Sequence, residues 1–142
     1  MIPAEENRHL PLVLIDTPVW EEYFRKKEGT YTEVNLLMDA GRVCSLDLVV
    51  GELLATAETP MEMKVFQDFT RIFPILPEPP GAWVEAARLS FRLRRRGKAL
   101  SLRESYLAVL AKGHGALLYT DNPHFREVRQ TVPLKLFTRR SF

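Results

Sequence analysis

Two short apolar segments of this chain each end directly at polar residues. The first, residues 12–15 with the sequence LVLI, runs into Asp16 and Thr17, and the second, residues 116–119 with the sequence ALLY, runs into TDN at residues 120–122. Segments that are apolar on both faces are typical of parallel strands buried inside a sheet. Because ligands bind at the carboxyl ends of such strands, we expect Asp16 and residues 120–122 to share one site.

Helical patterns separate these segments from one another and from further candidate strands. The spacing of apolar residues predicts helices over residues 17–24, 32–40, 46–57, 60–72, 79–97 and 101–113, and short extended segments over residues 43–45, 73–76 and 134–137. Strands that alternate with helices favour a parallel sheet with right-handed crossovers. We therefore expect an α/β fold of three α/β/α layers, with a central parallel sheet of four to five strands, in a single domain over residues 1–142.

Composition narrows the class of protein. With 142 residues, 46% of them hydrophobic, the chain can bury a core without disulfides, and its single cysteine, Cys44, is expected to be a small buried residue. No apolar stretch approaches the ~20 residues that cross a bilayer, and the chain opens with acids rather than with a basic segment. We expect a soluble cytoplasmic protein with no membrane partner.

Basic residues concentrate in one predicted helix and at its end, although the net charge is only +2. The cluster consists of Arg88, Arg92, Arg94, Arg95, Arg96 and Lys98. A solvated helix face explains such a cluster, and so does a surface for phosphates or an acidic partner. If the chain binds RNA, the expected contacts are Arg94, Arg95 and Arg96. The aromatic residues Trp83 and Phe91 of the same helix are expected in the core.

Five polar residues have the chemistry of a metal site, and each has an ordinary alternative role. Asp16 follows a buried strand, where a charge needs a cation or hydrogen-bond donors, but it also suits the N-cap of the next helix. Glu52 lies at the border of an apolar helix stripe, and Glu104 fits a capping box. Asp121 and Asn122 precede a proline and are common turn residues. Together, oxygen ligands from separate segments suit Mg²⁺ or Mn²⁺.

Four segments that contain these residues resemble the signature blocks of PIN-domain ribonucleases, specifically the VapC-type toxins of toxin–antitoxin pairs. The segments are residues 14–20 (LIDTPVW), 51–54 (GELL), 100–108 (LSLRESYLA) and 115–125 (GALLYTDNPHF). The resemblance implies an endoribonuclease that depends on Mg²⁺ or Mn²⁺ and hydrolyses RNA phosphodiester bonds to leave a 5′-phosphate. It also implies a cognate antitoxin that inserts a peptide into the acidic site, and often a homodimer.

The resemblance assigns roles by position. The successive metal ligands would be Asp16, Glu52, Glu104 and either Asn122 or Asp121. Thr17 and Thr120 correspond to hydroxyl residues that orient the acids or the attacking water. Three positions depart from the family pattern: Glu104 stands where an aspartate is usual, the fourth ligand position is the neutral Asn122 with Asp121 one residue earlier, and Pro18 stands where a small polar residue is common.

Two other functions remain open on the residues alone. A catalytically weak PIN-like domain would act mainly as a binding module, which Glu104 and the neutral Asn122 favour. A receiver-type signalling domain also holds Mg²⁺ at strand ends, but residues 132–135 match its usual lysine and proline poorly.

Overall fold

The computed structural model describes residues 10–129 and 131–138, and at its centre lies a parallel three-stranded sheet. Strand β1 (Val13–Ile15) lies between β2 (Val43–Cys44) and β3 (Leu117–Tyr119). Val13 pairs with Val43 on one side and with Leu117 on the other. Strand β1 is fully buried, as expected for a strand that is apolar on both faces. The predicted α/β fold with a parallel sheet is confirmed.

The segments predicted as outer strands form single bridges instead. On one edge Ile75 pairs with Ser45, and on the other Leu136 pairs with Leu118, both in parallel. Pro74, next to Ile75, has no N–H to donate, which limits pairing on that edge. Within residues 10–129 and 131–138 the sheet therefore has three strands, and the expected count of four to five is not confirmed.

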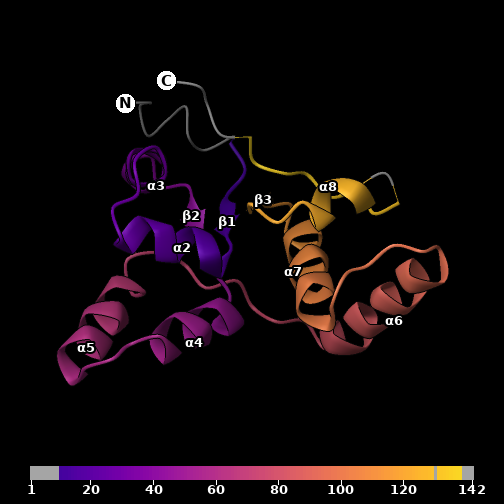
Figure 1. The fold of residues 1–142 in the computed structure, drawn as a ribbon, viewed down its shortest axis with the longest axis horizontal. Helices are drawn as coiled ribbons and strands as arrows, with labels where there is room; N and C mark the ends of the chain where they lie inside the picture. The colour runs from indigo at the N-terminus through magenta and orange to yellow at the C-terminus, as the bar shows by residue number, and fades with distance from the viewer. Residues whose placement is uncertain (1–9, 130, 139–142) are drawn as a thin grey trace.

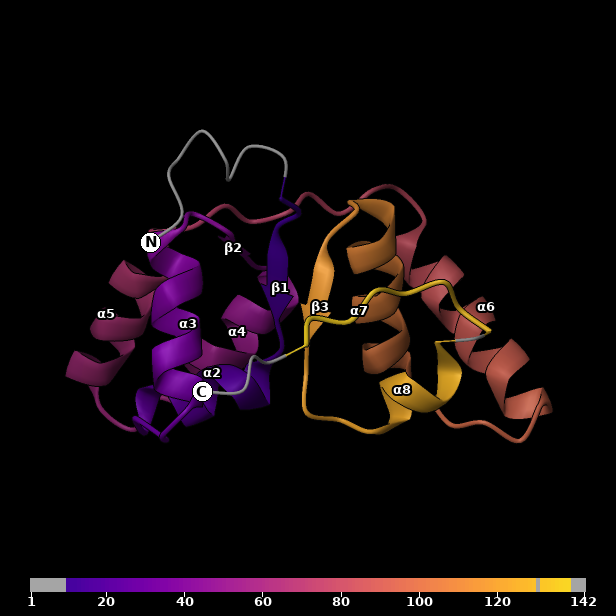
Figure 2. The same ribbon diagram turned by 90° about the horizontal axis from the view of Figure 1, so that it is seen from above.

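Helices flank this sheet on both sides. They are α2 (Thr17–Phe24), α3 (Thr30–Asp39), α4 (Asp47–Ala55), α5 (Pro60–Phe69), α6 (Ala82–Arg95), α7 (Leu102–Gly113) and α8 (His124–Val128). Helices α2 to α5 lie on one side of β1 and β3, and α6 to α8 lie on the other (Figures 1 and 2). Within the described ranges no helix has the length and apolar character that a membrane span requires.

The carboxyl ends of β1 and β3 meet the start of α7 at one end of the sheet. The backbone N–H of Asp16 donates to the carbonyl of Tyr119 at 3.0 Å, which ties the two strand ends together. The hydroxyl of Ser101 accepts from the backbone N–H of Glu104, and the Glu104 carboxylate accepts from the backbone N–H of Ser101. The predicted capping box is confirmed, and it fixes where α7 begins.

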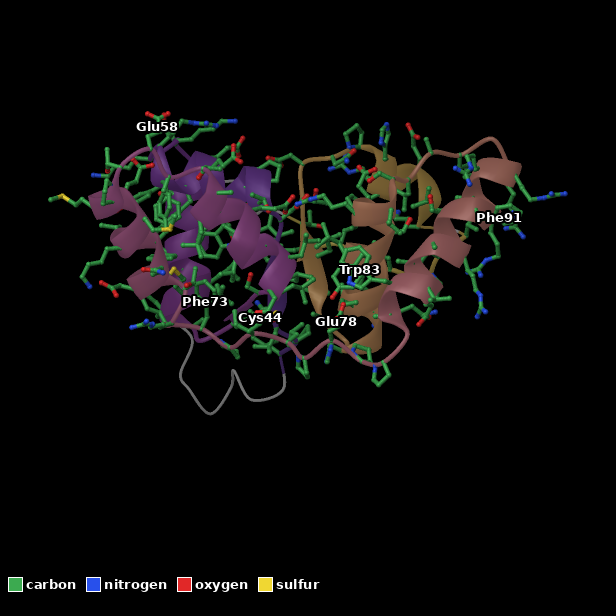
Figure 3. All side chains as sticks on the ribbon, turned by 90° about the horizontal axis from the view of Figure 1, so that it is seen from below. Cys44, Glu58, Phe73, Glu78, Trp83 and Phe91 are labelled. Atoms are coloured by element: carbon green, nitrogen blue, oxygen red, sulfur yellow. The ribbon has the colours of Figure 1, made fainter. Side chains whose placement is uncertain are left out.

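Helix α6 buries a different face from the one predicted. Its buried residues are Ala82, Ala86, Leu89 and Leu93. Trp83 and Phe91 are 40% and 52% exposed, so the expectation that they lie in the core is wrong. Trp83 lies flat against Tyr106 of α7, with ring centroids 3.7 Å apart, whereas Phe91 lies on the outer side of α6 (Figure 3). The small alanines let α6 approach α7 closely, which leaves the bulky rings to the surface.

The single cysteine of the chain belongs to the core. Cys44 is fully buried in β2 (Figure 3), and this burial raises the pKa of its thiol to about 12. A thiol of that kind is not a nucleophile at neutral pH. Cys44 is therefore a packing residue, as predicted.

Candidate active site

Asp16 is a buried acid at the carboxyl end of β1. Only 3% of the residue is exposed, and both carboxylate oxygens accept hydrogen bonds. Oδ1 accepts from the backbone N–H of Thr17 at 2.8 Å and from Nη2 of Arg103 at 2.9 Å. Oδ2 accepts from the hydroxyl of Thr120 at 3.0 Å. Asp16 thus caps α2, as its alternative role requires, but it also carries an ion pair that capping does not explain.

Arg103, in the first turn of α7, connects Asp16 to Glu52 of α4. Its Nε donates to Oε2 of Glu52 at 2.6 Å, and its Nη2 donates to Oε1 at 2.6 Å, which makes a bidentate pair. The same Nη2 lies 3.0 Å from the hydroxyl oxygen of Thr17, and that hydroxyl donates to Oε1 of Glu52 at 2.7 Å. One guanidinium therefore binds carboxylates from two separate elements.

Charge pairing sets the protonation of Glu52 and Arg103. Burial raises the pKa of Glu52, but the hydrogen bonds from Arg103 and Thr17 and the charge of Arg103 together lower it by more, so its pKa lies below the ordinary value of 4.5. The hydrogen bond to Glu52 raises the pKa of Arg103 despite the opposing effect of burial, and Asp16 raises it further. Both shifts favour the charged forms. At neutral pH Glu52 is a carboxylate held by a permanent cation.

Glu104 and Asn122 form a second part of the site. Oε1 of Glu104 accepts from the backbone N–H of Ser101 at 2.8 Å, and Oε2 accepts from the side-chain amide of Asn122. Thr120 links the two parts, because its hydroxyl donates to Asp16 while its oxygen accepts from the backbone N–H of Asn122 at 3.1 Å. The structure therefore joins six of the expected site residues in one network: Asp16, Thr17, Glu52, Glu104, Thr120 and Asn122.

Asp121 turns toward α2. It is exposed, and its carboxyl group lies near that of Glu22 on that helix. Burial raises the pKa of Glu22, while hydrogen bonds from Lys27 and Thr30 and the charge of Lys27 lower it to below its ordinary value of 4.5. Of the two alternatives for the fourth ligand position, Asn122 is the one that the structure joins to Glu104.

The acids are of the type that binds Mg²⁺ or Mn²⁺, but while Arg103 occupies them their arrangement does not fit such an ion. All carboxylate oxygens of Asp16 and Glu52 accept hydrogen bonds from protein groups, and so do both oxygens of Glu104. Over residues 10–129 and 131–138, no three His, Cys, Asp or Glu side chains are grouped so that they could hold a metal ion. The guanidinium of Arg103 lies where a cation between Asp16 and Glu52 would have to be.

The arginines predicted to contact RNA lie at the end of α6. Arg94, Arg95 and Arg96 are exposed, and the guanidinium of Arg95 lies 5.7 Å from the centre of the Phe91 ring. Arg96 helps to line a groove of 340 Å³ between α6, α7 and residues 131–133. Helix α7, whose first turn carries Glu104, lies between α6 and β3 (Figure 2). Their role in RNA binding stays a prediction.

Arg103 is the residue of this site that the sequence analysis missed. A cation in the first turn of a helix opposes the helix dipole, whose positive end lies there, so its position beside the N-cap Ser101 is unfavourable in isolation. That placement is a detectable sign that Arg103 has acidic partners. It does not by itself say which acids those are.

Comparison with known families and structures identifies the fold. The family model described as PIN domain matches residues 13–130. A comparison with curated proteins finds no match. Among solved structures, a toxin–antitoxin complex from Klebsiella pneumoniae matches with a TM-score of 0.71 and 14% identity, covering 92% of this chain and 99% of that one.

Two further solved structures are similar. VapBC2 from Rickettsia felis, bound to a DNA fragment from its promoter, has a TM-score of 0.69 and 17% identity, with 89% of this chain and 97% of that chain covered. FitAcB from Neisseria gonorrhoeae has a TM-score of 0.67 and 20% identity, with 90% and 98% covered. At these identities the likeness shows a shared fold.

Proposed function

Because the chain belongs to the PIN domain family, we propose that it is a VapC-type toxin, an endoribonuclease that hydrolyses RNA phosphodiester bonds and is inhibited by a cognate antitoxin. The observation that carries this proposal is the network of acids at the carboxyl ends of β1 and β3. That edge is where parallel α/β sheets hold their ligands. The family match over residues 13–130 argues against the alternative of a receiver-type signalling domain.

The proposed roles follow from the contacts of each side chain. Asp16 and Glu52 are the acids at the reacting centre, and Glu104 with Asn122 completes the site from the second part of the network. Thr17 and Thr120 hold Glu52 and Asp16 in place through their hydroxyls. The proposed cofactor is Mg²⁺ or Mn²⁺, which neutralises phosphate charge and activates water when bound.

The proposed partner is an antitoxin protein. The similar structures from Klebsiella pneumoniae, Rickettsia felis and Neisseria gonorrhoeae support it, because the first two are described as toxin–antitoxin or VapBC assemblies and all three share this fold. We also propose a homodimer, as the family resemblance implies, and a cytoplasmic location, as the composition indicates. Co-expression with any short reading frame found next to this gene, followed by light scattering of the purified material, tests both assemblies.

Cleavage of RNA by purified protein tests the proposed activity. We expect the wild type to cut single-stranded or looped RNA with Mn²⁺ and not with EDTA, and Asp16→Ala to reduce the rate by about 10³-fold or more. The matched control is Asp68→Ala, which removes an exposed acid on α5 and should leave the rate unchanged. Cleavage by Asp16→Ala in the presence of EDTA, at the rate that the wild type shows with Mn²⁺, would contradict the proposal.

A catalytically weak binding module is the second candidate, and the ion pairs of Arg103 favour it. A site whose carboxylates are already paired with an internal cation is expected to take up metal less readily. Calorimetry separates the two functions: tight binding of RNA or antitoxin without binding of Mn²⁺ favours the binding module, and Mn²⁺ binding coupled to cleavage favours the nuclease.

A further inference from the structure

We propose that Arg103 is an internal competitor of the divalent cation, so that a metal ion binds between Asp16 and Glu52 only when the Arg103 side chain has left. The identity of the cation rests on the proposed function, whereas the competition rests on the contacts of Arg103 itself. The side chain acts as a built-in counter-ion that keeps the site closed to metal.

The first argument is that Arg103 uses the same oxygens that a metal would need. Its guanidinium donates to both oxygens of Glu52 at 2.6 Å and to Oδ1 of Asp16 at 2.9 Å. A hard divalent cation coordinates carboxylate oxygens directly, so each of these lone pairs serves either the arginine or the metal. Two like charges within a few ångströms of one another also repel strongly in a partly buried site. Simultaneous binding is therefore strongly unfavourable.

The second argument concerns which partner can move. The Asp16 side chain is 4% exposed and cannot reach solvent, while the Arg103 side chain is 30% exposed and lies at the surface of the site. Removing every cation would leave a buried carboxylate unpaired, which is strongly unfavourable. Departure of Arg103 thus requires a replacement, and a divalent cation supplies one with greater charge. The two acids carry two negative charges, of which Arg103 balances one.

The third argument is the position of Arg103 in α7. It stands in the first turn, two residues after the N-cap Ser101, where the helix dipole disfavours a cation. The helix therefore gives Arg103 no support, and its place is kept by the two acids and by the Thr17 hydroxyl, whose oxygen lies 3.0 Å from Nη2. When a metal takes those acids, the contact with the neutral Thr17 hydroxyl remains for the Arg103 side chain, and such a hydrogen bond is weaker than the ion pairs that were lost.

Direct binding of Mn²⁺, measured by calorimetry without RNA, tests the competition. Arg103→Gln retains hydrogen-bond donors but no charge, and we expect it to bind Mn²⁺ about tenfold or more tightly than the wild type, with Arg103→Ala at least as tight. Arg103→Lys, which keeps the charge but not the bidentate geometry, should lie between them. The control is Lys112→Ala at the other end of α7, about 13 Å along the helix axis, which should change affinity by less than about twofold.

Thermal melting supplies a second readout that does not depend on activity. In EDTA, Arg103→Gln should melt below the wild type, because its acids have lost their counter-ion, and Mn²⁺ should raise its Tm by more than it raises that of the wild type. The double variant Asp16→Asn/Arg103→Gln should lose the tight site, which would assign that site to Asp16.

Two results would overturn the proposal. One is Mn²⁺ binding to both Arg103→Gln and Arg103→Ala no tighter than to Lys112→Ala. The other is tight Mn²⁺ binding that survives in the double variant, since the ion would then lie elsewhere. Tighter Mn²⁺ binding without RNA cleavage by any variant would support the competition and remove the proposed nuclease function.

Discussion

The two parts of the acidic network are held in different ways. Asp16 and Glu52 come from separate elements and are joined by the side chain of Arg103, whereas Glu104 is held by the backbone of its own helix through the capping box with Ser101. The first arrangement depends on charge and joins residues that are far apart in the sequence. The second depends on local hydrogen bonds that form with α7 itself. Charge should therefore matter much more at Asp16 than at Glu104.

This difference indicates which part of the site can exchange its bound cation. A side-chain ion pair can exchange one cation for another, while a capping box must stay intact for its helix to begin in the same place. We infer that the Asp16 and Glu52 part is the exchangeable half of the site. In the other half, the capping box holds Glu104, and with it the contact to Asn122, in a fixed position.

Loss of the charge at Asp16 is the largest expected effect. In EDTA, Asp16→Asn and Asp16→Ala should each lower the free energy of unfolding by about 3 kcal/mol, because each leaves Arg103 short of one acid in a partly buried site. Urea unfolding followed by circular dichroism measures this. The exposed control Asp68→Ala should change the free energy by less than about 0.5 kcal/mol. A small loss in Asp16→Asn would mean that Arg103 does not stabilise the fold through Asp16.

Replacement of Glu104 should have a smaller effect that follows hydrogen bonding rather than charge. Glu104→Ala removes the capping-box acceptor and should cost about 1 kcal/mol, while Glu104→Gln keeps an oxygen for the Ser101 N–H and should cost less than about 0.5 kcal/mol. The same urea experiment gives both values. If Glu104→Gln costs as much as Asp16→Asn, the two parts of the network are held alike and the comparison fails.

The sequence predicted the fixed half of the site better than the exchangeable half, for a physical reason. The capping box is a local pattern of four residues, so Ser101 and Glu104 predict it directly from the sequence. Placement of Asp16 at the end of a buried strand is likewise local. The bridge from Arg103 to Asp16 spans 87 positions and depends on how α7 packs against β3, the neighbour of β1, which no local pattern encodes.

The errors in the predicted fold have the same origin, because they too depend on packing and pairing between distant segments. The rings of Trp83 and Phe91 make an apolar stripe on α6 look like a core face, but close packing on α7 selects the face with Ala82 and Ala86. Residues 73–76 have the composition of a strand, yet the proline at 74 reduces their pairing to one bridge. In both cases packing or a missing N–H overrides a correct reading of hydrophobicity.

The pH dependence of the Glu52 contribution is the smallest expected effect and isolates the charge pairing from the hydrogen bonds. The folded pKa of Glu52 lies below its ordinary value of 4.5, so its contribution to stability is present above that pH and is lost as pH falls through the folded pKa. Wild type and Glu52→Gln should therefore differ by about 1 kcal/mol or less near neutral pH, since Glu52 is one-third exposed.

That difference should shrink as the pH falls below 4.5. Urea unfolding of both proteins at pH 7, 5, 4 and about 3.5 measures it, and taking the difference between them cancels the titration of the other acids, to the extent that it is the same in both proteins. A difference that stays constant over this range would mean that Arg103 holds Glu52 by hydrogen-bond geometry alone. The exchangeable half of the site would then be fixed in the same way as the capping box.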